Sequence, residues 1–96
     1  MKEFFETWRA ADQQRRYRMA SVSLFEKVFR GESKSTVAMI LGPPDQRPTV
    51  PDEYKAVGEI WVFFIKDPSL PKNAPEEFKV LFDTTGEYLG SEGKAD

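Results

Sequence analysis

The sequence predicts an α+β fold in which helices come first along the chain and strands follow. Three observations support this prediction. Apolar residues recur at helical spacing through roughly the first forty residues, apolar and polar residues alternate late in the chain, and all seven prolines lie between positions 43 and 75. Helices followed by strands are typical of an antiparallel sheet with helices on one face. We therefore expect two N-terminal helices packed on a three-stranded antiparallel meander, in the order α-α-β-β-β.

The first predicted element is one long amphipathic helix over residues 4–29. Its apolar residues recur at spacings of three, four or their sums, and no Pro or Gly interrupts the segment. Gly31 follows where a left-handed helix end is expected. The segment from Ser23 to Glu26 has the spacing of a capping box, so a break near Ser23 is the alternative, and a bend at 21–23 is an intermediate case. Residues 1–30 are thus the helical part of a single domain, and residues 31–96 are the remainder.

A short second helix is predicted at about 34–41. Ser33 or Ser35 can cap its first amides, because a hydroxyl oxygen accepts from the free N–H groups of a first turn. Gly42 can take the left-handed position at its end, and the two prolines that follow prevent the helix from continuing.

Three strands are predicted at 59–66, 78–83 and 87–90. The first is rich in β-branched and aromatic residues, and the second alternates between apolar and polar positions. Between the second and third, Asp83 and Gly86 have the places that a type I turn with a left-handed glycine requires. We interpret Asp83 as a turn residue and not as a catalytic one. An aspartic protease needs a contiguous Asp-Thr-Gly, and here an extra Thr interrupts that motif.

Composition excludes several kinds of chemistry. The chain has no Cys and no His, which excludes disulfides, zinc sites built on those residues, Cys nucleophiles and His-based triads. The adjacent acidic pairs 52–53 and 76–77 are read as solvated loop charge, since nothing predicts a cleft between facing carboxylates. We therefore expect no catalytic residue, no metal site and no cofactor.

Charge is uneven along the chain. Residues 1–30 hold seven basic and four acidic residues, whereas residues 31–96 hold seven basic and twelve acidic ones, and the net charge is −2. Arginines cluster with Trp8 and Tyr17 in the first helix, and we interpret them as its polar face. The minor alternative is that these side chains bind nucleic acid or an anionic lipid surface. No run approaches the ~20 apolar residues of a membrane-spanning helix, and the chain as given carries no targeting signal.

The first strand suggests a binding surface. It is apolar on both faces and lies at an edge of a simple meander, and an open apolar edge is one that proteins cover or use. The N-terminal aromatics either fold back as an internal cover or project as an anchor for a partner. We favour the anchor, because a helix over 4–29 is too long for one side of so small a sheet. The candidate partner-binding residues are Phe4, Phe5, Trp8, Trp61, Phe63 and Ile65.

A series of short motifs follows in order between residues 31 and 90. It comprises a Gly at the helix junction, a hydroxyl-capped short helix, Leu-Gly-x-Pro, a Trp-bearing strand, and a strand that ends apolar-x-Phe-Asp before a Gly turn. In this sequence the motifs are Gly31, Ser33, Val37, LGPPD at 41–45, WVFF at 61–64, VLFD at 80–83 and Gly86. In this order and spacing the chain resembles the BamE (SmpA/OmlA) family of small bacterial envelope domains. It departs from the family pattern in having no lipid-bearing Cys and in having Glu32 where the family often has an apolar residue.

The resemblance implies a helix–helix–three-strand fold. It also implies a periplasmic role in outer-membrane assembly or envelope integrity, performed by binding a protein and not by catalysis. An envelope location requires that a signal was removed from the native chain, and contact with the membrane would come from proximity or a lost lipid anchor. Related architectures also act as soluble inhibitors, such as the β-lactamase inhibitor proteins, which is the alternative function. Self-association through strand 59–66 or the N-terminal helix is a further possibility, and nucleic acid is not expected as a partner.

Overall fold

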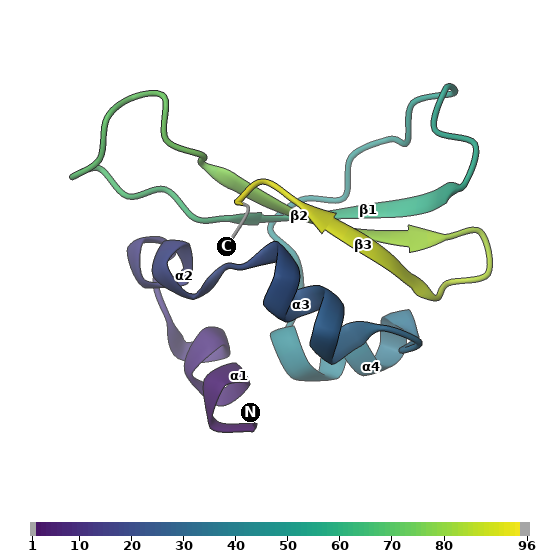
Figure 1. Ribbon diagram of the computed structural model, residues 1–96, viewed down its shortest axis with the longest axis horizontal. Helices are drawn as coiled ribbons and strands as arrows, with labels where there is room; N and C mark the ends of the chain where they lie inside the picture. Colours follow the sequence, from purple (N-terminus) through teal and green to yellow (C-terminus); the bar gives the residue numbers. More distant parts are fainter. Residues whose placement is uncertain (1, 95–96) are drawn as a thin grey trace.

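The computed structural model describes residues 2–94, with side chains from Phe5 onward, and shows an α+β fold with its helices before its strands (Figure 1). The predicted fold class is confirmed. Within the described residues the chain forms four helices and then three strands, which are α1 (Lys2–Ala10), α2 (Gln13–Met19), α3 (Val22–Phe29), α4 (Lys34–Leu41), β1 (Val57–Phe64), β2 (Glu77–Asp83) and β3 (Tyr88–Glu92).

The single helix predicted over 4–29 is wrong, because this segment is three short helices. The first break comes at Asp12, whose side chain accepts a hydrogen bond from the Arg15 amide at 2.9 Å. The second comes at Ser21, whose hydroxyl accepts from the Leu24 amide at 3.1 Å. Ser23 is not the cap. Both caps satisfy amides that a new helix leaves without a partner, so the chain turns without Pro or Gly.

The remaining helix begins and ends where the sequence predicts. The Ser33 hydroxyl accepts from the Thr36 amide at the start of α4. At its end Gly42 has a φ of 81°, and its amide donates to the Ala38 carbonyl. Gly31, which follows the C-cap residue Arg30 of α3, also has a positive φ of 82°. Helix ends in this left-handed region favour glycine, because a side chain there is strained.

The strands form an antiparallel meander in the order β1-β2-β3. β1 pairs with β2 so that Trp61 lies opposite Val80 and Phe63 lies opposite Phe78. The register shifts at Gly58, where the backbone of β1 approaches the Asp83 carbonyl closely. At the turn into β3, the Asp83 side chain accepts from the amides of Thr85 and Glu87, and Gly86 has a φ of 87°.

All four helices lie on one side of the sheet (Figure 1). The aromatic rings of the two layers are in contact: Trp8 in α1 lies 5.4 Å from Phe25 in α3, and Phe25 lies 4.7 Å from Phe78 in β2. Trp8 also touches Phe63 in β1, with ring centres 5.8 Å apart. The breaks at Asp12 and Ser21 allow α1 to fold back onto α3 and α4, so this side of the sheet becomes a closed core.

The free edge of β1 is partly covered by the loop that precedes it. Residues 45 and 46 pair with Val62, since the Gln46 amide donates to its carbonyl and the Gln46 carbonyl accepts from its amide. The Asp45 carboxylate accepts from the Phe64 amide at 2.8 Å. An unpaired strand edge invites association with another chain, and this loop closes part of it.

Candidate protein-binding face

The sheet face that points away from the helices is the candidate functional site, called here the outer face. In β1, β2 and β3 its side chains alternate with those of the core, and the register brings them together in rows. No described helix covers it, and the loops that enter and leave β1 rise at its two ends (Figure 1). Its residues are Ile60, Val62, Phe64, Glu77, Lys79, Leu81 and Glu92.

The side chains of the outer face become more exposed from β1 toward β3. Ile60 and Val62 are buried on the β1 side, where the preceding loop pairs with Val62. Phe64 and Leu81 are half-buried, and Glu77 and Glu92 are exposed. The face therefore offers half-buried apolar side chains beside charged ones.

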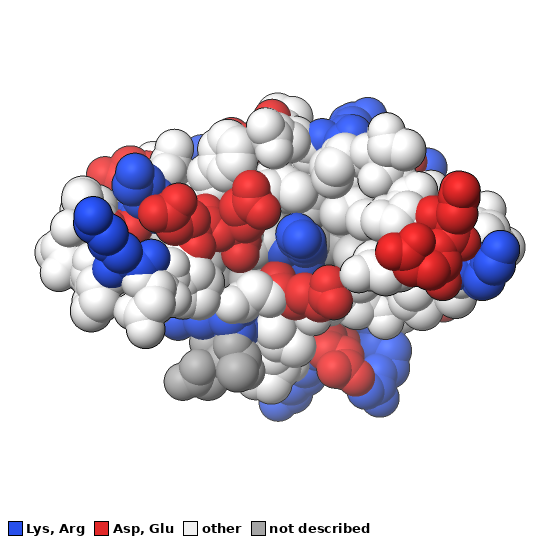
Figure 2. Space-filling model, turned by 90° about the horizontal axis from the view of Figure 1, so that it is seen from above, with Lys and Arg blue, Asp and Glu red and all other residues white. Residues whose placement is uncertain are grey.

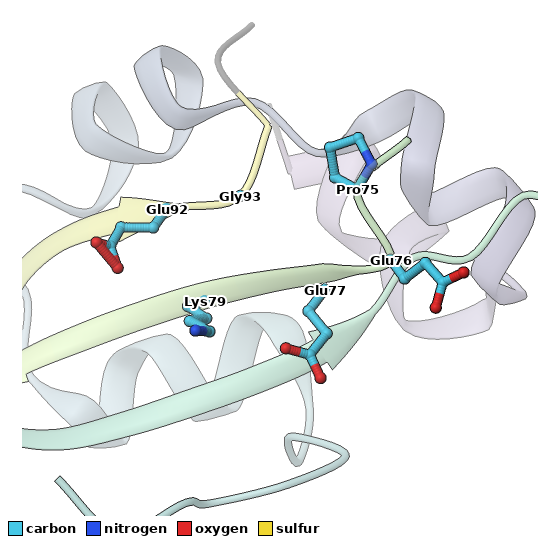
Figure 3. Close-up of a pocket in the computed structure, with 6 residues that line it drawn as sticks. All are labelled: Pro75, Glu76, Glu77, Lys79, Glu92 and Gly93. Carbon is cyan, nitrogen blue, oxygen red and sulfur yellow. The ribbon is translucent and has the colours of Figure 1, made fainter. Parts of the chain in front are cut away.

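Lys79 lies in the middle of this face. Figure 2 looks onto the face and shows a basic side chain at its centre with acidic side chains on two sides of it. The close-up in Figure 3 shows Lys79 between Glu77, from its own strand, and Glu92, from the neighbouring strand. Glu92 is its direct cross-strand partner in the register. These side chains line a shallow pocket of about 350 Å³, together with Pro75, Glu76 and Gly93.

A second pocket adjoins the first and shares Pro75 and Glu76 with it. Its volume is about 500 Å³, and the loop between β1 and β2 supplies its walls. Asp67 holds this loop in shape, because its carboxylate accepts from the Ser69 amide and hydroxyl and from the Gln14 side chain of α2. These hydrogen bonds lower the pKa of Asp67, the bond from the Ser69 hydroxyl most of all.

A separate polar cluster closes one end of the core. The Glu59 carboxylate accepts a hydrogen bond from the Trp61 indole and pairs with the Lys34 ammonium at 2.9 Å. These partners lower the pKa of Glu59, the indole bond first, because each favours the charged carboxylate. The Arg47 guanidinium lies 5.2 Å from the centre of the Trp61 ring. Each group has a partner within the fold, so this cluster fixes Trp61 and does not form an open site.

The residues that the sequence predicted as a partner anchor are in the core. Phe5 is 5% exposed, and Trp8, Phe63 and Ile65 are fully buried, while Trp61 is 3% exposed. The side chain of Phe4 lies outside the described residues. The prediction of an exposed anchor is wrong because the helix breaks let α1 fold back, which was the alternative of an internal cover.

The face of β1 that carries Trp61, Phe63 and Ile65 was assigned to the wrong side. Pairing with β2 places it beside Phe78 and Val80, and both of these residues are buried in the core. The signal for the correct face was present in β2, where Glu77, Lys79 and Leu81 alternate with the core residues. Glu92 and the apolar wall of the second pocket had no comparable signal, because both depend on how the loop and β3 fold.

The predicted turn and cap residues lie at element ends. Gly31, Ser33 and Gly42 flank the helices, and Asp83 and Gly86 form the β2–β3 turn. The Asp83 carboxylate accepts from the Thr85 hydroxyl at 2.7 Å, and this bond is the main cause of its lowered pKa. One of its oxygens, Oδ1, accepts the bonds from Thr85 and Glu87 within the turn. Across residues 2–94 no group of three acidic side chains is arranged to hold a metal ion.

The geometry defines a class: a small α+β domain with one closed sheet face and one open face between two proline-rich loops. Beyond this class, no protein-family model, no curated protein and no solved structure matches the chain. Among the described helices, none is long and apolar enough to cross a membrane.

Proposed function

We propose that this protein is a non-catalytic protein-binding domain that uses the outer face of its sheet. The observation that carries the proposal is the contrast between the two faces of one small sheet. The described helices all pack against one face, and the other keeps half-buried Phe64 and Leu81 beside charged side chains and the shallow pocket at Lys79. Partly exposed apolar residues with a charged rim favour a protein partner.

We further propose that the partner belongs to the bacterial cell envelope. The support is the ordered series of motifs from Gly31 to Gly86, which resembles the BamE family and implies a scaffolding role in envelope assembly. The helix-then-meander order of the fold agrees with what that resemblance implies. Fractionation of the source cells, with an antibody raised against the chain, tests this location directly. The proposal predicts the protein in the envelope fraction, and recovery in the cytosol alone would contradict it.

Partner binding is tested by presenting the full chain to a displayed library of protein fragments from the source organism. The bound fragment is then mapped by the change it causes in backbone amide NMR signals. The proposal predicts that the changes centre on Phe64, Lys79 and Leu81. Changes confined to the helices would contradict it. An enzymatic assay of the captured partner separates a scaffold, which leaves activity unchanged, from the alternative of an inhibitor.

A further inference from the structure

The end of the chain after β3 returns to the helical layer and contacts the connection between α2 and α3. The Lys94 carbonyl accepts a hydrogen bond from the Val22 amide at 3.1 Å. The Lys94 ammonium donates to the Ala20 carbonyl at 3.1 Å and lies 5.1 Å from the centre of the Tyr17 ring. These contacts are called here the Lys94 latch. They hold the end of α2 at the second helix break, although Lys94 and Ala20 are 74 positions apart in the sequence.

Arg16 joins α2 to α1. Its Nε donates to the Trp8 carbonyl at 3.0 Å, and its guanidinium lies 5.1 Å from the centre of the Trp8 ring. A second nitrogen of the same guanidinium donates to the Arg9 carbonyl at 3.5 Å. Between α2 and α3, in contrast, the backbone is extended at both Ala20 and Ser21. Two helices that are joined to each other and followed by an extended connection can move as one unit when the backbone angles of that connection change.

Two features lower the free energy needed to lift α1 and α2 from the core. No residue of α2 is buried, so α2 itself contributes little apolar burial. In α1 the Trp8 indole N–H is buried and has no hydrogen-bond partner among the described residues. A buried donor without a partner disfavours the closed state, because water hydrates the same N–H once α1 is lifted. Burial of Phe5 and Trp8 keeps the closed state dominant, and the polar contacts of the Lys94 latch add to it.

We propose that the Lys94 latch is a conformational device that holds α1 and α2 closed over the aromatic core, with the connection at residues 20–21 as the hinge. When the Lys94 ammonium leaves Ala20 and Tyr17, the two helices lift together while α3, α4 and the sheet stay folded. Opening removes the Trp8 ring from Phe25 and Phe63 and exposes these two rings. The device is separate from the outer face, so it does not depend on the proposed function.

Native-state hydrogen exchange of the full chain, followed at single amides, tests the device. In the parent protein the amides of α1 and α2 should share one opening free energy that is lower than that of the β2 amides, which exchange only when the whole domain unfolds. Lys94→Met removes the ammonium and keeps the length of the side chain, and it should make the α1 and α2 amides exchange about tenfold faster. The matched control Lys55→Met changes an exposed lysine in the loop before β1 and should leave these rates unchanged.

Gly58→Ala separates a latch from a residue that only stabilises the whole fold. It strains the β1–β2 pairing, which the open state retains, so it should speed β2 exchange and leave α1 and α2 exchange unchanged. Three outcomes overturn the proposal: α1 and α2 amides that exchange as slowly as those of β2 in the parent, unchanged rates in Lys94→Met, or faster α1 and α2 exchange in Gly58→Ala. The parent and Gly58→Ala measurements decide the matter even if Lys94→Met does not fold.

Discussion

The two faces of β2 differ although the same seven residues build both. Phe78, Val80 and Phe82 point toward the helices and are fully buried. On the other face Glu77 is exposed, and Lys79 and Leu81 are half-buried. Because successive strand side chains point to opposite faces, this alternation assigns one face to the core and leaves the other for solvent or a partner. A small sheet thus separates its core residues from its more exposed residues at a spacing of one residue.

The helices reinforce this separation. A continuous helix over 4–29 would extend beyond the sheet, whereas three short helices stack on the same side (Figure 1). The breaks therefore concentrate the aromatic residues on the inner face and leave none of the described helices for the outer one. Four predictions test this contrast, beginning with the largest expected effect.

Trp8→Ala should destabilise the fold by about 3–5 kcal/mol, because it empties a fully buried position between α1, α3 and β1. Chemical denaturation measures the loss. The control is Leu81→Ala on the outer face, which is half-buried and should cost about 1 kcal/mol or less. Similar losses for the two variants would show that the faces do not differ as described.

Gly58→Ala should cost about 1–3 kcal/mol, since the added Cβ would lie 2.5 Å from the Asp83 carbonyl oxygen and the strands would have to shift. Gly90→Ala is the control, because a Cβ there meets nothing within 4 Å. Its unfolding free energy should stay within about 0.5 kcal/mol of the parent's. A tolerated alanine at position 58 would contradict the close approach that sets the β1–β2 register.

Glu59→Gln should reduce stability by about 1–1.5 kcal/mol at neutral pH, because the partly exposed carboxylate accepts from Trp61 and pairs with Lys34. The folded pKa of Glu59 lies below its ordinary value of 4.5. Its contribution is therefore fully present above 4.5 and is lost as pH falls through the folded pKa. Denaturation across pH should show the parent and variant converging in acid, and a gap that widens in acid would contradict this assignment.

Ser21→Ala should produce the smallest loss, about 0.5–1 kcal/mol, by removing the side-chain cap of α3. Ser23→Ala is the comparison, since Ser23 lies within α3 and its hydroxyl contacts the Ser21 hydroxyl at 3.3 Å without itself capping an amide. A larger loss at position 23 than at 21 would place the break where the capping-box spacing predicts it and not where the structure has it.

Much of the fold was predictable from the sequence because it depends on local signals. Ser33 and Gly42 bound α4, and Asp83 and Gly86 form the turn, so the short helix and the hairpin follow from caps and turn chemistry. The break at Asp12 was missed, and a break near Ser23 was only the alternative to one long helix, for a physical reason. Asp12 and Ser21 occur equally well on the exposed side of a longer helix, and only the packing of α1 onto the core decides otherwise.

The proposed binding face was predictable only in part. The alternation in β2 indicates which of its residues lie outside the core, and pairing extends that assignment to β1. The sequence also indicated that one sheet face lacked a helix. It did not indicate that Glu92 would join Glu77 beside Lys79, because that juxtaposition depends on a register shift between β2 and β3. Nor did it indicate the second pocket, which depends on the turns of the β1–β2 loop.

The most direct test of the two-face account uses the absence of cysteine from the chain. Single cysteines are introduced as Lys79→Cys and Val80→Cys, and their rates of labelling by a thiol reagent are compared under native conditions. The account predicts rapid labelling at position 79 on the outer face and labelling at position 80 that proceeds only through unfolding. Equal rates, or faster labelling at position 80, would contradict the assignment of one face to the core and the other to the molecular surface.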